Sequence, residues 1–194
     1  MIIGLARPLY AVAVKELDMV WRTRRVVTGQ DEQGRSKIIF DSQAENVQEM
    51  ESMPGVALTD LWETLSAPAD NRGGLDAADR PVRLTAPNPG SIFRLVEFPP
   101  DSQWRDVASA GTAFASIGAD GAPDPHSSDP MRHKTNTIDY IVVIKGEIHA
   151  IVDESEVLLK PGDVFIQRGT MHSWSVRSDE VCVIAVVLVA AEPI

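Results

Sequence analysis

The segment 131–176 constrains the fold of this chain more than any other part of the sequence. Its first half carries polar side chains and then apolar side chains at alternate positions, which are His133, Thr135, Thr137, Asp139, Ile141 and Val143. In an extended strand, alternate side chains point to the same face of the sheet. The pattern therefore predicts a strand whose one face carries a histidine and a carboxylate before it turns apolar.

Turn-forming residues divide the rest of this segment into short strands. Gly146 and the segments 153–155, 161–163 and 167–170 are rich in glycine, proline and polar residues, and β-prone runs lie between them. Such spacing is typical of an antiparallel barrel built from hairpins. If these strands close into a barrel, their inward faces bring His172 toward the first strand.

The first half of the segment contains a recognisable motif. His133-Lys134-Thr135 is followed after three residues by Asp139 and after six more by Gly146. This order resembles the first motif of the cupin superfamily, in which H-x-H is followed by a glutamate and a glycine. The resemblance implies an all-β fold, the double-stranded β-helix of the cupin or jelly-roll barrel.

The second half resembles the second cupin motif. Gly162 and His172 stand where that motif has its opening glycine and its histidine, and Val176 replaces its closing asparagine. The 15 residues of segment 147–161 separate the two motifs, which is the compact spacing of microbial cupins. The resemblance covers roughly residues 130 to 190 of a small single-domain cupin.

The resemblance also implies a metal site, with departures. Cupins usually hold one divalent metal with two histidines and a glutamate from the first motif and a histidine from the second. Here His133 and His172 match two ligands, Thr135 stands in place of the middle histidine, and Asp139 replaces the glutamate. Two histidines and a carboxylate still form a facial triad for iron, and such residues also bind manganese, zinc or nickel. The alternative is a degenerate cupin in which these residues only form hydrogen bonds.

The predicted substrate pocket is mostly apolar. Its side chains are Thr135, Ile141, Val143, Trp174 and Val176. The leading hypothesis is a metal-dependent enzyme, either an oxygenase, a lyase, an isomerase or a decarboxylase, acting on a small aromatic, polyketide-like or oxo-acid substrate. The competing hypothesis is a metal-free cupin that binds a small molecule without catalysis.

Composition excludes some classes of partner. The chain has 18 basic and 28 acidic residues and a formal net charge of −10, so neither nucleic acid nor an anionic membrane surface is an expected partner. The single cysteine, Cys182, lies in the apolar run 181–190. This run is too short to span a bilayer as a helix, and its composition predicts a buried strand. A buried lone thiol fits a reducing, cytoplasmic location.

The N-terminal half is expected to extend the barrel. Residues 1–14 are apolar but lack a leading positive charge and are interrupted by Arg7-Pro8, so no signal peptide is predicted. Residues 1–18 are expected to form a loosely packed arm. We expect one structural domain in which residues 1–100 add strands to a barrel core at 101–194.

The N-terminal half also contains a predicted hairpin. β-prone runs at 21–28 and 36–40 flank a polar loop. Because a hairpin outside the minimal barrel leaves strand edges that need cover, we also expect a homodimer.

The remaining segments are assigned by pattern. Residues 56–65, 82–84 and 92–98 are predicted strands, and residues 102–117 repeat apolar side chains at helical spacing. Segment 119–130 is expected to be irregular and to lie over the barrel mouth. His126 and His149 are expected to lie outside the site.

Overall fold

The computed structural model of the protein describes residues 20–194. The predictions of an N-terminal arm and of no signal peptide therefore lie outside the described residues. In this part of the chain, eleven strands form three sheets, accompanied by one short α-helix and two 3-10 turns. The first five strands are β1 (Arg24–Gln30), β2 (Ser36–Gln43), β3 (Val47–Glu49), β4 (Ala57–Thr64) and β5 (Ser91–Phe98). The others are β6 (Thr137–Lys145), β7 (Ile148–Val152), β8 (Ser155–Leu159), β9 (Val164–Arg168), β10 (His172–Ser175) and β11 (Cys182–Ala190).

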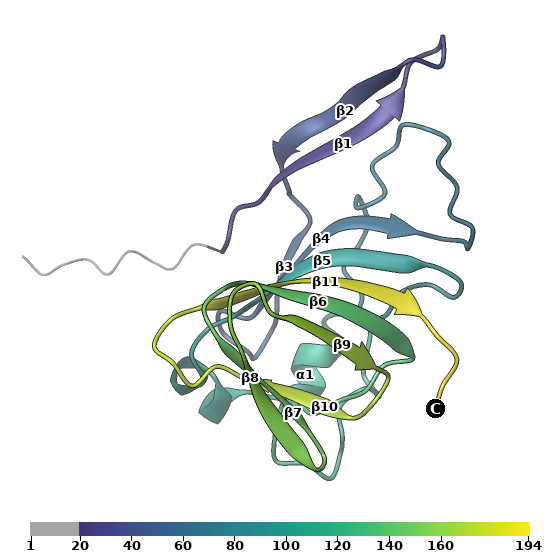
Figure 1. Ribbon diagram of the computed structural model, residues 1–194. Helices are drawn as coiled ribbons and strands as arrows, with labels where there is room; N and C mark the ends of the chain where they lie inside the picture. The colour runs from purple at the N-terminus through teal and green to yellow at the C-terminus, as the bar shows by residue number, and fades with distance from the viewer. Residues whose placement is uncertain (1–19) are drawn as a thin grey trace, which may run out of the picture.

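Two of the sheets enclose the main core. The larger has six strands in the order β3-β4-β5-β11-β6-β9, and the smaller has three in the order β10-β7-β8. All pairings within them are antiparallel, and the smaller sheet lies beneath the larger one in Figure 1. The predicted all-β jelly roll is confirmed. The strands β4 and β5 from the N-terminal half belong to the same sheet as β6, β9 and β11.

Alternation along β6 sets which side chains enter the barrel. Asp139 and Ile141 are buried, whereas Tyr140 and Val142 between them are exposed on the outer face. Gly146 then allows the chain to turn into β7, because its φ is +67° and a Cβ there would lie 2.5 Å from the carbonyl oxygen of Val181. The inward face predicted from the sequence is confirmed, since all six side chains predicted on it are buried. The strand is shorter than predicted, because β6 begins at Thr137 and His133 lies before it in an isolated bridge with His172.

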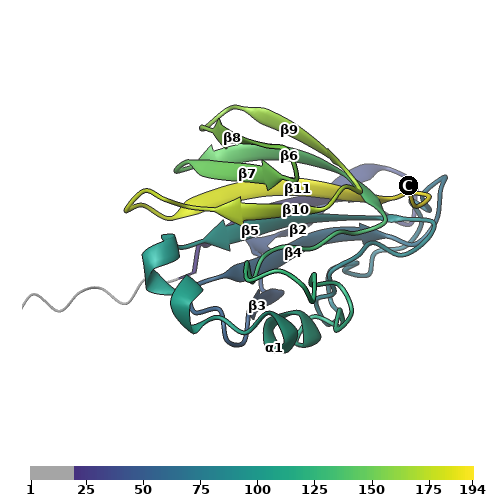
Figure 2. The same ribbon diagram turned by 90° about the horizontal axis from the view of Figure 1, so that it is seen from below.

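The predicted helix at 102–117 is wrong in its extent. The segment forms two 3-10 turns, Asp101–Gln103 and Arg105–Val107, and a six-residue helix, α1 (Ala110–Ala115). Ala108 and Ser109 are extended, which separates the turns from the helix. In the view of Figure 2, α1 lies near β3, on the side away from β8 and β9.

Two other local predictions also need correction. Residues 82–84 do not form a strand. The N–H of Leu84 donates a hydrogen bond to the Ile117 carbonyl at 3.1 Å, next to α1, and not to a neighbouring strand. The short strand β3 was not foreseen, because its three residues carry no repeating pattern. Among the described residues, no helix has the length and apolar character needed to cross a membrane.

The hairpin of β1 and β2 is confirmed and stands apart from both larger sheets. Its strands pair only with each other, and it projects away from the barrel in Figure 1. At its base, Arg25 donates to the Leu61 carbonyl at 3.0 Å and forms an ion pair with Asp76. Val26 and Ile38 on the hairpin are exposed.

The homodimer stays a prediction, and the hairpin gives it a test. If the projecting hairpin packs on a second copy, replacing both Val26 and Ile38 by aspartate should convert a dimer into a monomer, because charged groups resist burial in an apolar interface. Sedimentation equilibrium of the full-length protein would measure this. Leu75→Asp, at an exposed loop position, is the matched control. A parent protein that is monomeric at micromolar concentration would contradict the prediction.

Candidate functional site

A small cavity lies between the two larger sheets. Its volume is about 80 Å³, and its walls are apolar except for the side chains of Arg94, His133, Asp139 and His172 and the indole of Trp174. Such a mostly apolar cavity with a few convergent polar groups is the usual form of a ligand site. These polar groups come from both sheets.

The two histidines lie side by side because their backbones are paired. The N–H of His133 bonds to the His172 carbonyl at 3.0 Å, and the N–H of His172 bonds to the His133 carbonyl at 3.0 Å. Residues paired in this way project neighbouring side chains to the same face. The imidazole centroids are 4.4 Å apart. The predicted convergence of His133 and His172 is therefore present in the structure.

Backbone carbonyls fix the orientation of both rings. Nδ1 of His133 lies 2.7 Å from the Met131 carbonyl oxygen, and Nδ1 of His172 lies 2.9 Å from the Thr170 carbonyl oxygen. Each Nδ1 carries the proton, because a carbonyl can only accept. Each Nε2 then has a free lone pair, and within residues 20–194 neither Nε2 has a hydrogen-bond partner.

The surroundings keep these rings neutral. Burial, together with the neighbouring His172 ring, lowers the pKa of His133 to about 3. Burial also lowers the pKa of His172. Two neutral imidazoles with free Nε2 atoms can bind a metal or accept a proton from a ligand.

A polar cluster holds the segment that leads into His133. The Asp129 carboxylate accepts hydrogen bonds from the Met131 N–H at 3.0 Å, from Ser173 Oγ at 2.5 Å and from Arg105 Nη1 at 2.6 Å. Arg105 Nη2 also donates to the Trp174 carbonyl at 2.5 Å. The irregular segment 119–130 is thus tied to β10, and its end places His133 against His172.

Asp139 enters the same cavity from the larger sheet. Its side chain is only 6% exposed, and its Oδ1 has no hydrogen-bond partner among the described residues. Burial raises the pKa of Asp139 to about 6, against the opposing effects of the Thr137 hydroxyl and the positive charge of Arg94. The pKa of Asp139 is therefore affected by the charge of Arg94, whereas the pKa of His133 is affected by His172 and Asp129.

These positions give a partial fit to a metal site. The oriented imidazoles have the donor atoms and the backbone hydrogen bonds of metal-binding histidines. In the part of the chain that the structure describes, however, no three His, Cys, Asp or Glu side chains are grouped closely enough to hold a metal ion. Catalytic zinc sites usually have three protein ligands. His133 and His172 fit such a site as a pair, and the role of Asp139 as third ligand stays a prediction.

The predicted pocket residues are only partly in contact with the cavity. Ile141 and Trp174 line it, whereas Thr135, Val143 and Val176 are buried elsewhere in the core. The Thr135 hydroxyl lies 2.7 Å from the hydroxyl of Thr137. His126 and His149 lie outside the cavity, as expected; Nδ1 of His149 is 3.6 Å from Glu156.

Arg94 is the site residue that the sequence analysis missed. It lies in β5 on the same parity as Ile92, Val96 and Phe98, and all four side chains are inward or partly buried. A single arginine on an otherwise apolar face of a strand can indicate a buried polar site. The sequence did not show which face of β5 is buried, because Phe93 and Leu95 make the opposite face apolar as well.

Comparison with known proteins agrees with this fold and motif arrangement. Residues 122–189 match the family model described as a cupin domain. The chain is 49% identical over 51 residues to the "Phomopsin biosynthesis cluster protein C'" of Diaporthe leptostromiformis, a match that covers 26% of this chain and 27% of that protein. It is 25% identical over 158 residues to the "Cupin-domain-containing oxidoreductase fogC" of Aspergillus ruber, covering 79% of this chain and 64% of the relative.

The matches thus span about a quarter of the first relative's length and less than two thirds of the second's. Among solved structures, the Schizosaccharomyces pombe Cnp3 cupin domain aligns with a TM-score of 0.43 and 13% identity, covering 88% of this chain and 89% of that one. The family match covers both histidines of the cavity as well as strands β6 to β10 and nearly all of β11. Residues 122–189, which include both histidines of the cavity, are therefore identified as a cupin domain.

Proposed function

We propose that this protein is a cupin-domain enzyme of the oxidoreductase type that acts on a small organic molecule in the cavity between the two sheets. The observation that carries the proposal is the His133–His172 pair, whose Nδ1 atoms are tied to carbonyls and whose Nε2 atoms are free at an apolar cavity. The relatives described as cupin-domain-containing oxidoreductases, at 25–26% identity, support this type of reaction.

In this proposal the imidazole pair holds one divalent metal through Nε2. A bound metal would polarise a substrate oxygen or bring a redox couple to the cavity. The protein's own part is to keep both imidazoles neutral and oriented, which burial and the carbonyls of Met131 and Thr170 do. The apolar walls exclude water from the reacting molecule and strengthen the electrostatic effect of each polar group.

The cavity volume narrows the substrate class. A cavity of about 150 Å³ accommodates benzene, so a cavity of about 80 Å³ takes only a few heavy atoms. By volume alone, a short oxo-acid or an uncharged carbonyl compound of the same size fits without movement. An aromatic or polyketide-like substrate requires the walls to move apart.

Metal content of the freshly purified full-length protein tests the metal site. We expect about one equivalent of a divalent metal in the parent and its loss in His133→Ala and His172→Ala, because each removes one of two imidazole donors. His149→Ala is the matched control, since His149 lies outside the cavity beside Glu156. Asp139→Asn, measured alongside, loses metal only if Asp139 is a third ligand.

A second candidate function is a metal-free cupin that binds a small molecule without catalysis. The observation that favours it is that Asp139 is not grouped with the two histidines. Equal metal content in the parent and all three histidine variants would contradict the metal site. If such protein still binds small carbonyl compounds, with a change in fluorescence that Trp174→Phe removes, the binding function is supported.

A further inference from the structure

We propose that Asp139 and Arg94 form a selective wall of the cavity, which takes small molecules that carry a hydroxyl group next to a carbonyl oxygen. The inference rests on the proposed function, because it names the substrate class of the same cavity. The hydroxyl would donate to Asp139 Oδ1, and the carbonyl oxygen would accept from Arg94 Nη1.

Sheet order places these two side chains on one inner face. β11 lies between β5 and β6, with Arg94 paired to Val186 and Asp139 paired to Leu188. Val186 and Leu188 also line the cavity, so all four side chains share one face of the larger sheet. The histidine pair instead belongs to the bridge between segment 119–135 and β10 of the smaller sheet. The cavity thus has a histidine side and an Asp139–Arg94 side.

Arg94 keeps a donor for a ligand. Its Nε donates to Asp60 Oδ1 at 2.8 Å, and its Nη2 donates to Asp60 Oδ2 at 3.2 Å and to the Arg83 carbonyl at 2.5 Å. Nη1 has only a long contact of 3.4 Å with the Leu84 carbonyl, beyond the usual range of 2.7–3.2 Å. A guanidinium has five N–H groups, so Nη1 has at least one left for another acceptor.

Asp139 supplies the complementary acceptor. Its Oδ1 is buried and has no partner among the described residues, although leaving a buried oxygen without a hydrogen bond is unfavourable. A ligand hydroxyl would supply the missing hydrogen bond. A ligand carboxylate would not, because it would bring a second negative charge next to this one.

Together these groups define a small ligand. It needs one donor and one acceptor on neighbouring carbon atoms and a short apolar remainder that contacts Val186, Leu188 and Ile184. A hydroxyketone such as hydroxyacetone meets these requirements within the size of the cavity. Acetone has the same carbonyl and apolar groups but lacks the hydroxyl.

The test is an NMR titration of the full-length protein at about pH 7.5 with hydroxyacetone and with acetone as separate probes. We expect hydroxyacetone to bind about tenfold more tightly, since one hydrogen bond to a charged group supplies that discrimination. Asp139→Leu should abolish the preference. Thr135→Val, also buried and polar in the parent but outside the cavity, should retain it.

A second measurement needs no variant. Intermolecular NOEs from the hydroxyacetone methylene to the methyl groups of Leu188 and Ile141, the neighbours of Asp139, should appear in the parent protein. Equal affinity for the two probes, or a preference that survives Asp139→Leu, would overturn the selective wall and leave the cavity and the proposed function intact. If neither probe binds the cavity, the inference fails, whereas the proposed function is decided separately by the metal content of the histidine variants.

Discussion

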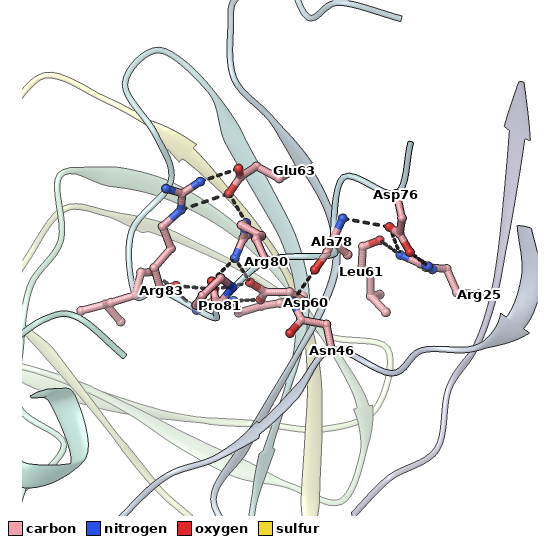
Figure 3. Close-up of polar contacts among 12 residues, drawn as sticks. Arg25, Asn46, Asp60, Leu61, Glu63, Asp76, Ala78, Arg80, Pro81 and Arg83 are labelled. Atoms are coloured by element: carbon pink, nitrogen blue, oxygen red, sulfur yellow. Dashed lines mark hydrogen bonds and ion pairs between the residues drawn. The ribbon is translucent and has the colours of Figure 1, made fainter. Parts of the chain in front are cut away.

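Removal of the Asp60 carboxylate is expected to destabilise this protein more than any other single charge deletion in the barrel. Asp60 is fully buried, and its carboxylate forms an ion pair with Arg94 at 2.8 Å. It forms a second ion pair with Arg80 at 2.7 Å, and Arg80 also contacts Glu63 at 2.6 Å (Figure 3). Arg94 is itself only 2% exposed. Deleting one partner of a buried ion pair leaves an uncompensated charge, which costs about 3–5 kcal/mol.

The measurement is the thermal unfolding midpoint of Asp60→Ala. For a chain of this length the loss corresponds to a fall in Tm of roughly 6 to 20 °C. Asp41→Ala is the matched control, because the ion pair of Asp41 with Arg24 is exposed and should change the Tm little.

A double variant separates charge from packing. Asp60→Leu with Arg94→Met removes both charges and keeps volume, so it should recover much of the lost stability. If Asp60→Ala lowers the Tm no more than Asp41→Ala does, the buried network does not have the assigned importance.

Acid destabilisation is the second large expected effect. The pKa of His133 in the folded protein is about 3, below the ordinary value of 6.5, and the pKa of His172 is also lowered. As the pH falls below about 6.5, these two histidines therefore become protonated in the unfolded chain but stay neutral in the folded protein. Stability that is fully present above this pH is lost as the pH falls toward 3, and His133 alone accounts for about 3 kcal/mol by about pH 4.5.

Asp139 acts in the opposite direction. Its pKa of about 6 in the folded protein exceeds the ordinary value of 3.8, so its contribution to stability is present below about 3.8 and is lost as the pH rises through 6. Asp139→Asn should therefore raise the free energy of unfolding near pH 7.5 by up to about 3 kcal/mol and steepen the loss in acid.

Urea unfolding of chelator-treated protein at several pH values would measure both effects. Asp179→Asn, at an exposed position, is the matched control. Because Asp139 opposes the histidines in the parent, the decisive protein is Asp139→Asn. If its free energy of unfolding is constant from pH 7 to 4.5, the assignment of two buried neutral imidazoles is contradicted.

The sequence predicted the cupin barrel because its signals there are local. Alternation from Thr137 to Val143 and the turn at Gly146 define β6 and its inward face without reference to other strands. The pairing of His133 with His172 followed from the resemblance to both motifs. The helix at 102–117 was predicted too long because apolar spacing does not reveal that Ala108 and Ser109 are extended.

The Asp139–Arg94 side of the cavity was not accessible from sequence reasoning. The two residues are 45 positions apart, and their proximity depends on β11 lying between β5 and β6. Likewise, Arg105 and Asp129 hold the segment before His133 through contacts with β10 that no local pattern specifies. Such long-range pairs depend on strand order, which short motifs do not encode.

The histidine pair is the central element of the proposed function, and imidazole nitrogen NMR tests it most directly. In ¹⁵N-labelled full-length protein stripped of metal, His133→Ala and His172→Ala assign the two rings among the four histidines of the chain. On addition of Zn²⁺, the Nε2 resonances of both rings should shift together at one equivalent, while each Nδ1 remains protonated and bonded to its carbonyl. Unchanged Nε2 resonances of both rings at saturating Zn²⁺, or a shift at Nδ1 in their place, would contradict a metal held by this pair.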